Sequence, residues 1–427
     1  MIDQTATRAD IVRGRRQRVS DFNRLWIGQG ISAFGSQVTS LALPLTAVLY
    51  LDATATQVGL LATTREAAYV GLMLFLGVVV DRHRRRPAMI AADLGRAAVT
   101  LAVPLLAWAG ALSMPYLYVA AFLLGSLAVV FSLAYRAYLP SLLGADELLA
   151  GNSRLQATES LSDVAGPGLA GLLIQLVRAP YALVADAFSF LVSAGSVASV
   201  RATEPAVTTG PATDGGFVRR VFADIGAGLA FTFRQPVLRM LAAASAIFNV
   251  FATIMLTIFV VYAVRVAHLS PSEIGLVFAG FGVGGVAAAA SLSRTMRIGV
   301  GRLLGIGYVV GAGVIVALPF VGGAPVTRTA WLCALFFVAG CAIVSANIVE
   351  MTMRQAATPG HLQGRIAAGF GFLIGALTPV AAAVAGVLGD QIGPRATLIV
   401  AAAGIPASLP WILFSRVRRV RSVDELA

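Results

Sequence analysis

The sequence predicts an all-α membrane protein with twelve transmembrane helices in two pseudo-symmetric six-helix bundles. Three observations lead to this fold class: the composition, the number of long apolar runs, and the similarity between the two halves of the chain. Of the 427 residues, 58% are hydrophobic and 12% are charged, which is about half the charged fraction of a soluble protein. The positive charge lies in short gaps between apolar runs, so a soluble nucleic-acid-binding domain is not expected.

Twelve apolar runs of about 20 residues can each cross a bilayer as a helix. They lie approximately at 25–49, 57–80, 87–109, 115–137, 154–176, 181–200, 240–263, 273–292, 303–321, 329–350, 367–388 and 395–415. The first run is longer than the apolar region of a cleaved signal. The arginine-rich segment before it is therefore expected to be a retained cytoplasmic tail.

The distribution of positive charge predicts the orientation of the helices. All 32 basic residues are arginine, so the phosphate-binding lysine of an ATPase loop and a Schiff-base lysine are both absent from the sequence. The arginines cluster in alternate gaps between the runs, and the remaining gaps hold single arginines. Because positive loops stay inside, we expect a multi-pass protein of the cell membrane with both termini in the cytoplasm.

The longest segment between runs divides the chain into three parts. We expect an N-terminal bundle at 1–200, a linker at 201–238 and a C-terminal bundle at 239–427. The second part of the linker has apolar residues at helical spacing with charged residues between them. This pattern predicts an amphipathic helix on the cytoplasmic surface.

The two halves share local sequence features, which suggests duplication of a six-helix unit in parallel orientation. TQVGLLA at 56–62 opens run two and SEIGLVF at 272–278 opens run eight, so that Gly59 matches Gly275. Pro167 in run five has Pro379 as its counterpart in run eleven.

Two polar stripes occur at matching positions of runs one and seven. They consist of Gln29, Ser32, Ser36 and Ser40 in run one, and Asn249, Thr253 and Thr257 in run seven. A lipid-facing helix has little use for such a stripe, whereas a water-accessible cavity does. We expect these residues to line a substrate cavity. The alternative is that they form hydrogen bonds between packed helices.

Acidic residues inside the apolar runs are candidates for proton coupling. They are, in order of preference, Glu66, Asp163 and Asp186. A carboxylate in the hydrocarbon region is costly, so it is paired, protonated or functional. The alternative for each is a structural acid that is hydrogen-bonded to a neighbouring helix.

Glycine and proline in runs five and eleven predict bending and close packing. Run five contains Gly166, Pro167 and Gly168, and run eleven contains Pro379 after two glycines. Proline removes a backbone hydrogen bond and glycine permits close approach. We expect these runs to be the hinged, tightly packed pair at the interface between the halves.

Several motifs together resemble the major facilitator superfamily, in the drug-efflux branch that includes the enterobactin and macrolide exporters. The motifs are the loop Gly77-x-x-x-Asp81-Arg82-x-x-Arg85, AADLGRA at 91–97, GNSRLQATES at 151–160, DAFSFLVSA at 186–194 and RQAATPGHLQGR at 354–365. The turn at Gly166 and Pro167 is similar to the antiporter signature of helix five. The resemblance covers essentially the whole chain and implies a central cavity lined by helices one, four, seven and ten.

The resemblance also implies a conformational latch formed by Gly77, Asp81, Arg82 and Arg85. Asp81 lies at the carboxyl end of helix two, where the helix dipole disfavours an acid. It is therefore expected to meet arginines or the positive start of another helix.

These features predict a transporter rather than an enzyme. We expect export of an amphipathic small molecule (a drug, antibiotic or siderophore-like metabolite) by alternating access as a proton antiporter, with no cofactor or metal and with the proton gradient as energy source. The expected partners are the substrate and the lipid bilayer, with no nucleic acid, and the protein is expected to act as a monomer. The alternatives are an importer or uniporter of a small polar nutrient and a non-transporting membrane scaffold.

Overall fold

The computed structural model describes residues 8–81, 84–143, 145–201, 216–421 and 425. For 8–16, 69, 73–81, 141, 145–146, 217–222, 361 and 416 it describes the backbone alone. The helices of the first half are α1 (Arg8–Leu45), the π-helical turn η1 (Thr46–Tyr50), α2 (Ala55–Asp81), α3 (Arg85–Trp108), α4 (Met114–Leu142), α5 (Ala145–Val177) and α6 (Ala179–Ser199). After α7 (Gly216–Arg234), the second half contains α8 (Pro236–Arg265), α9 (Pro271–Thr295), η2 (Met296–Ile298), α10 (Val300–Ala317), η3 (Leu318–Phe320), α11 (Pro325–Ala356), η4 (Gly360–Leu362), α12 (Gln363–Gln391), α13 (Pro394–Gly404), η5 (Ile405–Ser408), α14 (Leu409–Leu413) and η6 (Arg416–Arg419).

The helices confirm the predicted fold class. Among the described residues, 11 helical segments are long and apolar enough to cross a membrane by length and composition. The 27-residue helix α2 occupies the place of the second predicted run. The last span runs from Pro394 to Leu413 and joins α13, η5 and α14. Twelve spanning segments therefore form two bundles, α1–α6 and α8–α14.

Local sequence determines where several of these helices begin. Ser270 and Glu273 form a capping box at the start of α9, in which the Glu273 carboxylate accepts a 2.8 Å hydrogen bond from the Ser270 amide. Pro271 takes the first helical position, where a missing N–H costs nothing. Gly393 precedes α13 with a φ of 86°, a conformation that glycine adopts without steric strain.

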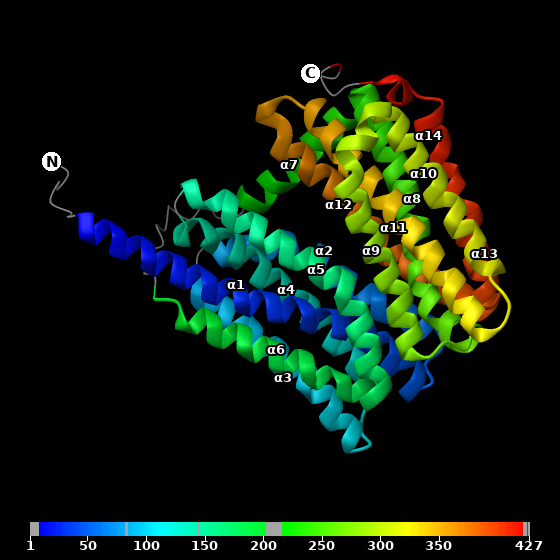
Figure 1. The fold of residues 1–427 in the computed structure, drawn as a ribbon, viewed down its shortest axis with the longest axis horizontal. Coiled ribbons are helices and arrows are strands. Elements are labelled where there is room, and N and C mark those ends of the chain that lie inside the picture. The colour runs from blue at the N-terminus through cyan, green and yellow to red at the C-terminus, as the bar shows by residue number, and fades with distance from the viewer. Residues whose placement is uncertain (1–7, 82–83, 144, 202–215, 422–424, 426–427) are drawn as a thin grey trace.

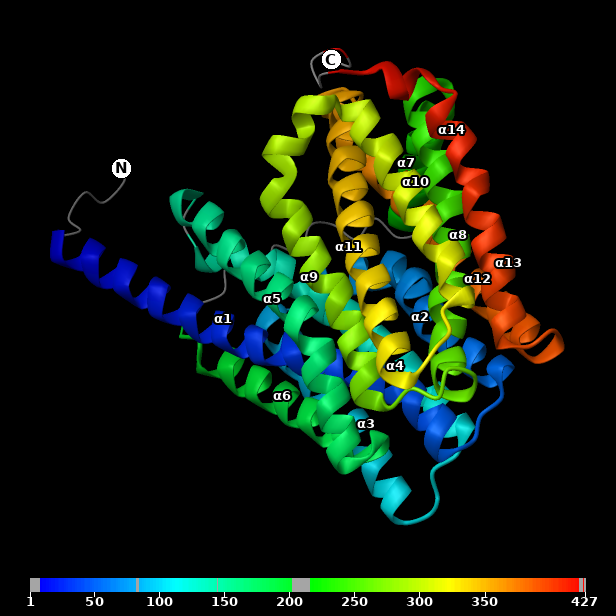
Figure 2. The ribbon, with the colours of Figure 1, turned by 45° about the vertical axis from the view of Figure 1, so that its right-hand side comes forward.

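The two bundles diverge from a shared end and give the molecule a V shape (Figure 1). We call the helix ends beside the arginine-rich loops the basic end, and the opposite ends the far end. The view in Figure 2 shows the same divergence at the basic end.

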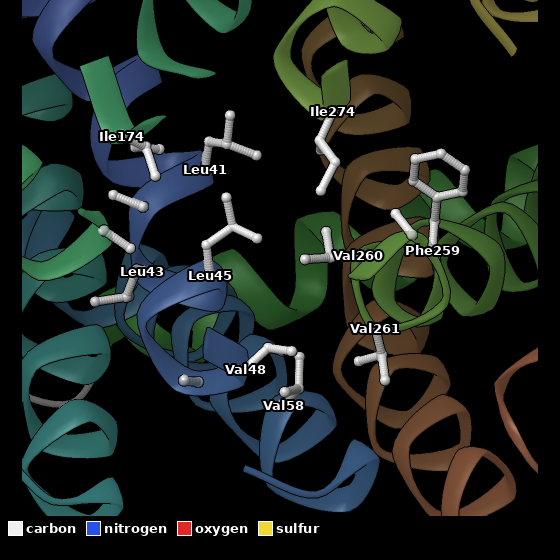
Figure 3. Packing of buried hydrophobic residues seen from close by; sticks show 14 of the residues in the cluster. Leu41, Leu43, Leu45, Val48, Val58, Ile174, Phe259, Val260, Val261 and Ile274 are labelled. Atoms are coloured by element: carbon white, nitrogen blue, oxygen red, sulfur yellow. The ribbon is translucent and has the colours of Figure 1, made fainter. Parts of the chain in front are cut away.

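The buried apolar residues follow this shape. One cluster at the basic end lies within the first bundle, around Phe22 and Tyr138. Another lies within the second bundle, around Leu241 and Phe370, and includes residues at the end of the last span. A third cluster at the far end contains residues of both bundles. Figure 3 shows Leu41 and Leu45 of the first half beside Val260 and Ile274 of the second.

The bundles are held together mainly by two helix pairs, α2 with α12 and α5 with α9. Runs five and eleven, which correspond to α5 and α12, therefore both lie at the interface between the halves. Each of them packs across the interface against a different helix rather than against the other. A pseudo-two-fold arrangement explains this, because α5 and α12 are equivalent helices on opposite sides of the axis.

Glycine pairs set how closely these helices approach. A Cβ atom on Gly59 would lie 2.7 Å from the Cα atom of Gly386, and a Cβ atom on Gly171 would lie 2.8 Å from the Cα atom of Gly275. Both pairs therefore bring backbone against backbone, which larger side chains do not allow. Gly59 and Gly275, which the sequence comparison matched, therefore occupy equivalent positions: each contacts a glycine of the opposite bundle.

Helix α7 covers the second part of the linker and packs mainly against α12, with a smaller contact to α8. The Arg365 guanidinium Nε lies 2.8 Å from an Asp224 carboxylate oxygen. Gly228 approaches the same turn of α12, since a Cβ atom there would lie 2.1 Å from the Arg365 carbonyl oxygen. The linker helix is thus attached to the second bundle at the basic end.

We predict that Gly275→Val destabilises the protein by about 1–3 kcal/mol, because its Cβ atom would lie 2.4 Å from the Pro167 carbonyl oxygen and force α5 and α9 apart. Thermal unfolding of the purified protein in detergent measures the effect. The matched control is Gly313→Val, because a Cβ atom at Gly313 meets nothing within 4 Å. Equal melting temperatures for the two variants would contradict the role given to the glycine contact.

Candidate functional site

The polar stripe of α1 is divided between helix packing and accessible positions. Gln29 Nε2 donates a 2.8 Å hydrogen bond to Ser193 Oγ on α6, and Ser32 is buried. Ser36 is half-buried and Ser40 is exposed, with its hydroxyl donating to the Gln37 carbonyl at 2.9 Å. Among the described residues, Ser36 and Ser40 are therefore the members of this stripe that are neither buried nor hydrogen-bonded to another helix.

The polar stripe of α8 is half-buried throughout. Asn249 Nδ2 donates to the Ser245 carbonyl of its own helix at 2.8 Å. The hydroxyls of Thr253 and Thr257 have no hydrogen-bond partner among the described residues. Phe248, one residue before Asn249, packs edge-on against Tyr308 with ring centroids 5.4 Å apart. The Phe248 ring thus packs against α10 within the second bundle, next to the start of the stripe. That both stripes line a cavity stays a prediction.

Asp163 lies where three helices meet. Its carboxylate oxygen Oδ1 accepts a 2.8 Å hydrogen bond from Gln37 Nε2 on α1, and the residue is exposed. Gly166, one turn further along α5, lets the Gln37 side chain lie close, because a Cβ atom there would be 2.5 Å from Gln37 Cγ. The backbone of Asp163 touches α9, since a Cβ atom on Gly282 would lie 2.7 Å from the Asp163 carbonyl oxygen. Asp163 is thus both accessible and placed at a crossing between bundles.

Glu66 is paired with its neighbour Arg65. The Arg65 Nη2 atom lies 3.2 Å from Glu66 Oε1, with half of the arginine side chain and 30% of the glutamate side chain exposed. Thr63, one turn earlier, donates a 3.0 Å hydrogen bond to the Pro379 carbonyl of α12. Glu66 therefore lies on the part of α2 next to the second bundle.

Asp186 is fully buried inside the first bundle. One carboxylate oxygen accepts a hydrogen bond from Thr39 on α1, and the other accepts one from Ser189 at 2.8 Å. Gly35 of α1 gives it room, because a Cβ atom there would lie 2.5 Å from Asp186 Oδ1. The carboxylate is within electrostatic range of Arg96 and Asp93 on α3. Burial and hydrogen bonds to α1 and to its own helix are what a structural acid requires, so the alternative given for this residue stays open.

Sequence reasoning missed the ion pair beside Asp186. Asp93 and Arg96 are buried on α3 and bind each other, and Ser193 Oγ donates to the second Asp93 oxygen at 2.6 Å. The Arg96 guanidinium lies over the rings of Phe131 and Phe190, 4.6 Å and 4.4 Å from their centroids. An acid followed three residues later by an arginine inside an apolar run was the available signal.

A second missed acid lies in the other bundle. Glu350 of α11 is buried and accepts hydrogen bonds from Ser245 on α8 and from the Tyr308 hydroxyl on α10, the latter at 3.2 Å. Arg354, one turn later, lies over the ring of Phe370 at 4.8 Å from its centroid. Glu350 ends the tenth predicted run, so the run boundary hid it.

The predicted latch is only partly described by the structure. Gly77 and Asp81 belong to the last turns of α2, for which only the backbone is described, and Arg82 lies outside the described residues. Arg85 begins α3. The latch therefore stays a prediction.

The predicted hinges lie within continuous helices. α5 runs through Gly166 and Pro167, and α12 runs through Pro379. Bending at these residues stays a prediction.

Comparisons with known proteins support the resemblance inferred from the motifs. The family model described as Major Facilitator Superfamily matches residues 25–379. The multidrug efflux pump Tap of Mycolicibacterium fortuitum is 27% identical over 407 residues, which cover 91% of this chain and 94% of that protein. Macrolide efflux protein A of Streptococcus pyogenes is 25% identical over 183 residues, which cover 42% of this chain and 44% of that protein.

Solved structures share the fold at low sequence identity. A bacterial homologue of the iron transporter ferroportin in an inward-facing state superposes with a TM-score of 0.72 at 15% identity, covering 93% of this chain and 98% of that one. The nucleoside transporter NupG superposes with a TM-score of 0.67 at 12% identity, covering 92% and 98%.

We predict that Arg96→Met lowers the free energy of unfolding by about 3–5 kcal/mol, because it leaves a buried carboxylate without its cation. Adding Asp93→Asn to this variant is expected to recover part of the loss. Arg65→Met is the control, since it breaks a half-exposed pair whose contribution is about 1 kcal/mol or less. Thermal unfolding of the four proteins checks this, and equal losses for Arg96→Met and Arg65→Met would contradict it.

Proposed function

This chain belongs to the major facilitator superfamily, a family of membrane transporters, and we propose that it exports an amphipathic small molecule by secondary-active transport. The observation that carries the proposal is the V-shaped packing of the two bundles (Figure 1). The apolar cluster shared by both bundles lies at the far end, whereas the clusters at the basic end each belong to one bundle. Rocking of the bundles about the glycine crossings would give alternating access.

The orientation proposed for this arrangement follows from charge. We propose that the protein lies in the cell membrane with the basic end and both termini in the cytoplasm, which the arginine-rich loops at that end support. The far end, where the bundles meet, then faces outward. A substrate would enter from the cytoplasm or the inner leaflet and leave on the opposite side, which is the direction of export.

The proposed substrate is an amphipathic drug, antibiotic or siderophore-like metabolite. Two relatives with similar sequences are named as a multidrug efflux pump and a macrolide efflux protein. The half-buried stripe on α8 carries Asn249, Thr253 and Thr257, whose amide and hydroxyls can bind the polar groups of such a substrate. Ser36 and Ser40 supply hydroxyls from the first bundle.

We assign the coupling proton to Asp163. Among the three predicted acids, Asp163 is exposed in this arrangement and lies at a crossing between the bundles. Gln37 supports both protonation states, because its amide N–H donates to the ionised carboxylate and its amide oxygen can accept from the protonated one. Glu66 is second, since it is already paired with Arg65, and Asp186 is third, since it is fully buried among α1, α3 and α6.

The proton gradient is the proposed energy source of the transporter, which uses no cofactor. It acts as a monomer in the bilayer and has no nucleic-acid partner. Import or uniport of a polar nutrient is the alternative that the transport experiments below separate from export.

We predict that Asp163→Asn abolishes proton-driven transport in reconstituted vesicles while substrate binding persists, because asparagine keeps the shape and a hydrogen-bond acceptor but cannot bind or release a proton. The measurement is substrate flux with and without an imposed pH gradient. Glu159→Gln is the control, since Glu159 is exposed on the same helix one turn earlier. Gradient-driven flux at the normal rate in Asp163→Asn would remove the assignment.

We further predict that expression of the protein in a host lacking its own pumps raises the inhibitory concentration of at least one cationic or neutral amphipathic antibiotic. The physical reason is active removal from the cytoplasm and the inner leaflet. The control is Gly275→Val, in which the crossing of α5 and α9 is disturbed. Increased cellular accumulation of the compounds instead of protection would favour the import alternative.

A further inference from the structure

The carboxylate of Asp390 at the far end of α12 binds the beginning of α2 in the opposite bundle. Asp390 Oδ1 accepts a hydrogen bond from the Ala55 amide at 2.8 Å, and Oδ2 accepts one from the Thr56 amide at 2.9 Å. Both oxygens are therefore used in one contact between the bundles. Hydrogen bonds from backbone amides to a carboxylate are among the stronger ones in proteins.

The start of α2 leaves these two amides for Asp390. Thr54 and Gln57 cap the helix locally, with the Gln57 side chain accepting from the Thr54 amide at 2.9 Å and Thr54 Oγ1 accepting from the Gln57 amide at 3.3 Å. The amides of Ala55 and Thr56 point out of the first turn and need another acceptor. The carboxylate of Asp390 meets the positive end of the α2 dipole, which offsets its unfavourable position in the last turn of α12, at the negative end of its own helix.

An ion pair reinforces the same junction. Arg265 at the end of α8 contacts Asp52 Oδ1 at 3.0 Å and the Ala53 carbonyl at 2.8 Å. Asp52 and Ala53 form the loop that leads into Thr54 and α2. The loop before α2 is thus held by α8 while its first amides are held by α12, and both of these helices belong to the second bundle.

The pseudo-symmetric junction between α5 and α9 lacks this contact. Asp390 lies four residues after Gly386 of one crossing, and Gln175 lies four residues after Gly171 of the other. Ala55 lies four residues before Gly59, and Pro271 lies four residues before Gly275. Proline has no N–H to donate, and α9 closes its own first turn with the Ser270–Glu273 capping box. Within the part of the chain that the structure describes, the directional contact therefore exists on one side of the axis.

We propose that Asp390, assisted by Arg265, is a one-sided lock that holds the far end of the transporter closed. The glycine crossings allow the helices to slide and rock, whereas the two amide–carboxylate hydrogen bonds exist only when α2 and α12 are in register. The ion pair exists only while the loop before α2 lies against the end of α8. Opening of the far end separates the first turn of α2 from the last turn of α12 and breaks them. Asp390 therefore stabilises the arrangement in which the basic end is open.

The test measures the populations of the two arrangements without any substrate, so its outcome does not depend on the proposed export function. Spin labels are placed in a background without the native cysteines, Cys333→Ala and Cys341→Ala. The first pair, Ala111→Cys with Ala324→Cys, reports on the distance between the bundles at the far end. The second pair, Ala150→Cys with Ser293→Cys, reports on the distance at the basic end. All four positions are exposed. Distance distributions are recorded by double electron–electron resonance in lipid nanodiscs.

We predict that Asp390→Asn shifts the ratio of far-end-open to far-end-closed molecules about fivefold, the effect expected for loss of one helix-capping interaction. Far-end distances lengthen and basic-end distances shorten together. Ala55→Pro tests the donor side, because it keeps the charge of Asp390 and removes one amide at a helix position that tolerates proline. It is expected to shift both distributions in the same direction.

The matched control is Gln175→Ala at the equivalent position of the other crossing, which is expected to leave both distributions unchanged. Asp390→Glu is expected to restore part of the closed population, since it retains the charge and both acceptor oxygens. Unchanged distributions in both Asp390→Asn and Ala55→Pro, with folding verified by monodisperse elution, would overturn the lock. An equal shift in Gln175→Ala would overturn its one-sidedness.

Discussion

Close backbone contact at two helix crossings is the constraint on which the rest of this structure depends. Gly59 meets Gly386 where α2 crosses α12, and Gly171 meets Gly275 where α5 crosses α9. Apolar side chains alone would not distinguish a neighbouring helix from lipid, so close packing supplies much of the association between bundles. Because the crossings lie toward the far end, the two halves can diverge at the other end.

Helix α1 shows how this geometry divides polar residues among different tasks. Its contacts with α6 use Gln29 and Thr39, whose partners are Ser193 and Asp186, and its contact with α5 uses Gln37 and Asp163. The first set connects to the buried pair of Asp93 and Arg96, where desolvation makes every missing partner costly. Because Gln29, Thr39 and Gln37 all lie on α1, the buried network that fixes this helix also positions Gln37 beside the accessible Asp163.

Each end of α2 has an acid that can meet the positive start of a helix. The contact at the carboxyl end is an expectation, and the contact at the amino end is observed. At the carboxyl end, Asp81 is expected to act as a latch on the basis of the family resemblance and of the helix dipole. At the amino end, the structure places Asp390 of the opposite bundle on the first two free amides. A transporter that alternates between two arrangements needs contacts that break at each end in turn, and directional bonds to a helix terminus satisfy that need.

The sequence by itself determined the spans, the two bundles, the family and the presence of Asp163 and Asp186 as unusual acids, because apolar length and charge are local properties of the chain. It could not determine that Ser32 would be buried while Ser40 stays exposed, that α5 would pack on α9, or that Glu350 would meet Tyr308. Helical periodicity groups residues on a face but does not say which helix covers it. Asp390 and Ala55 are 335 positions apart, and only the crossing of α2 with α12 brings them together.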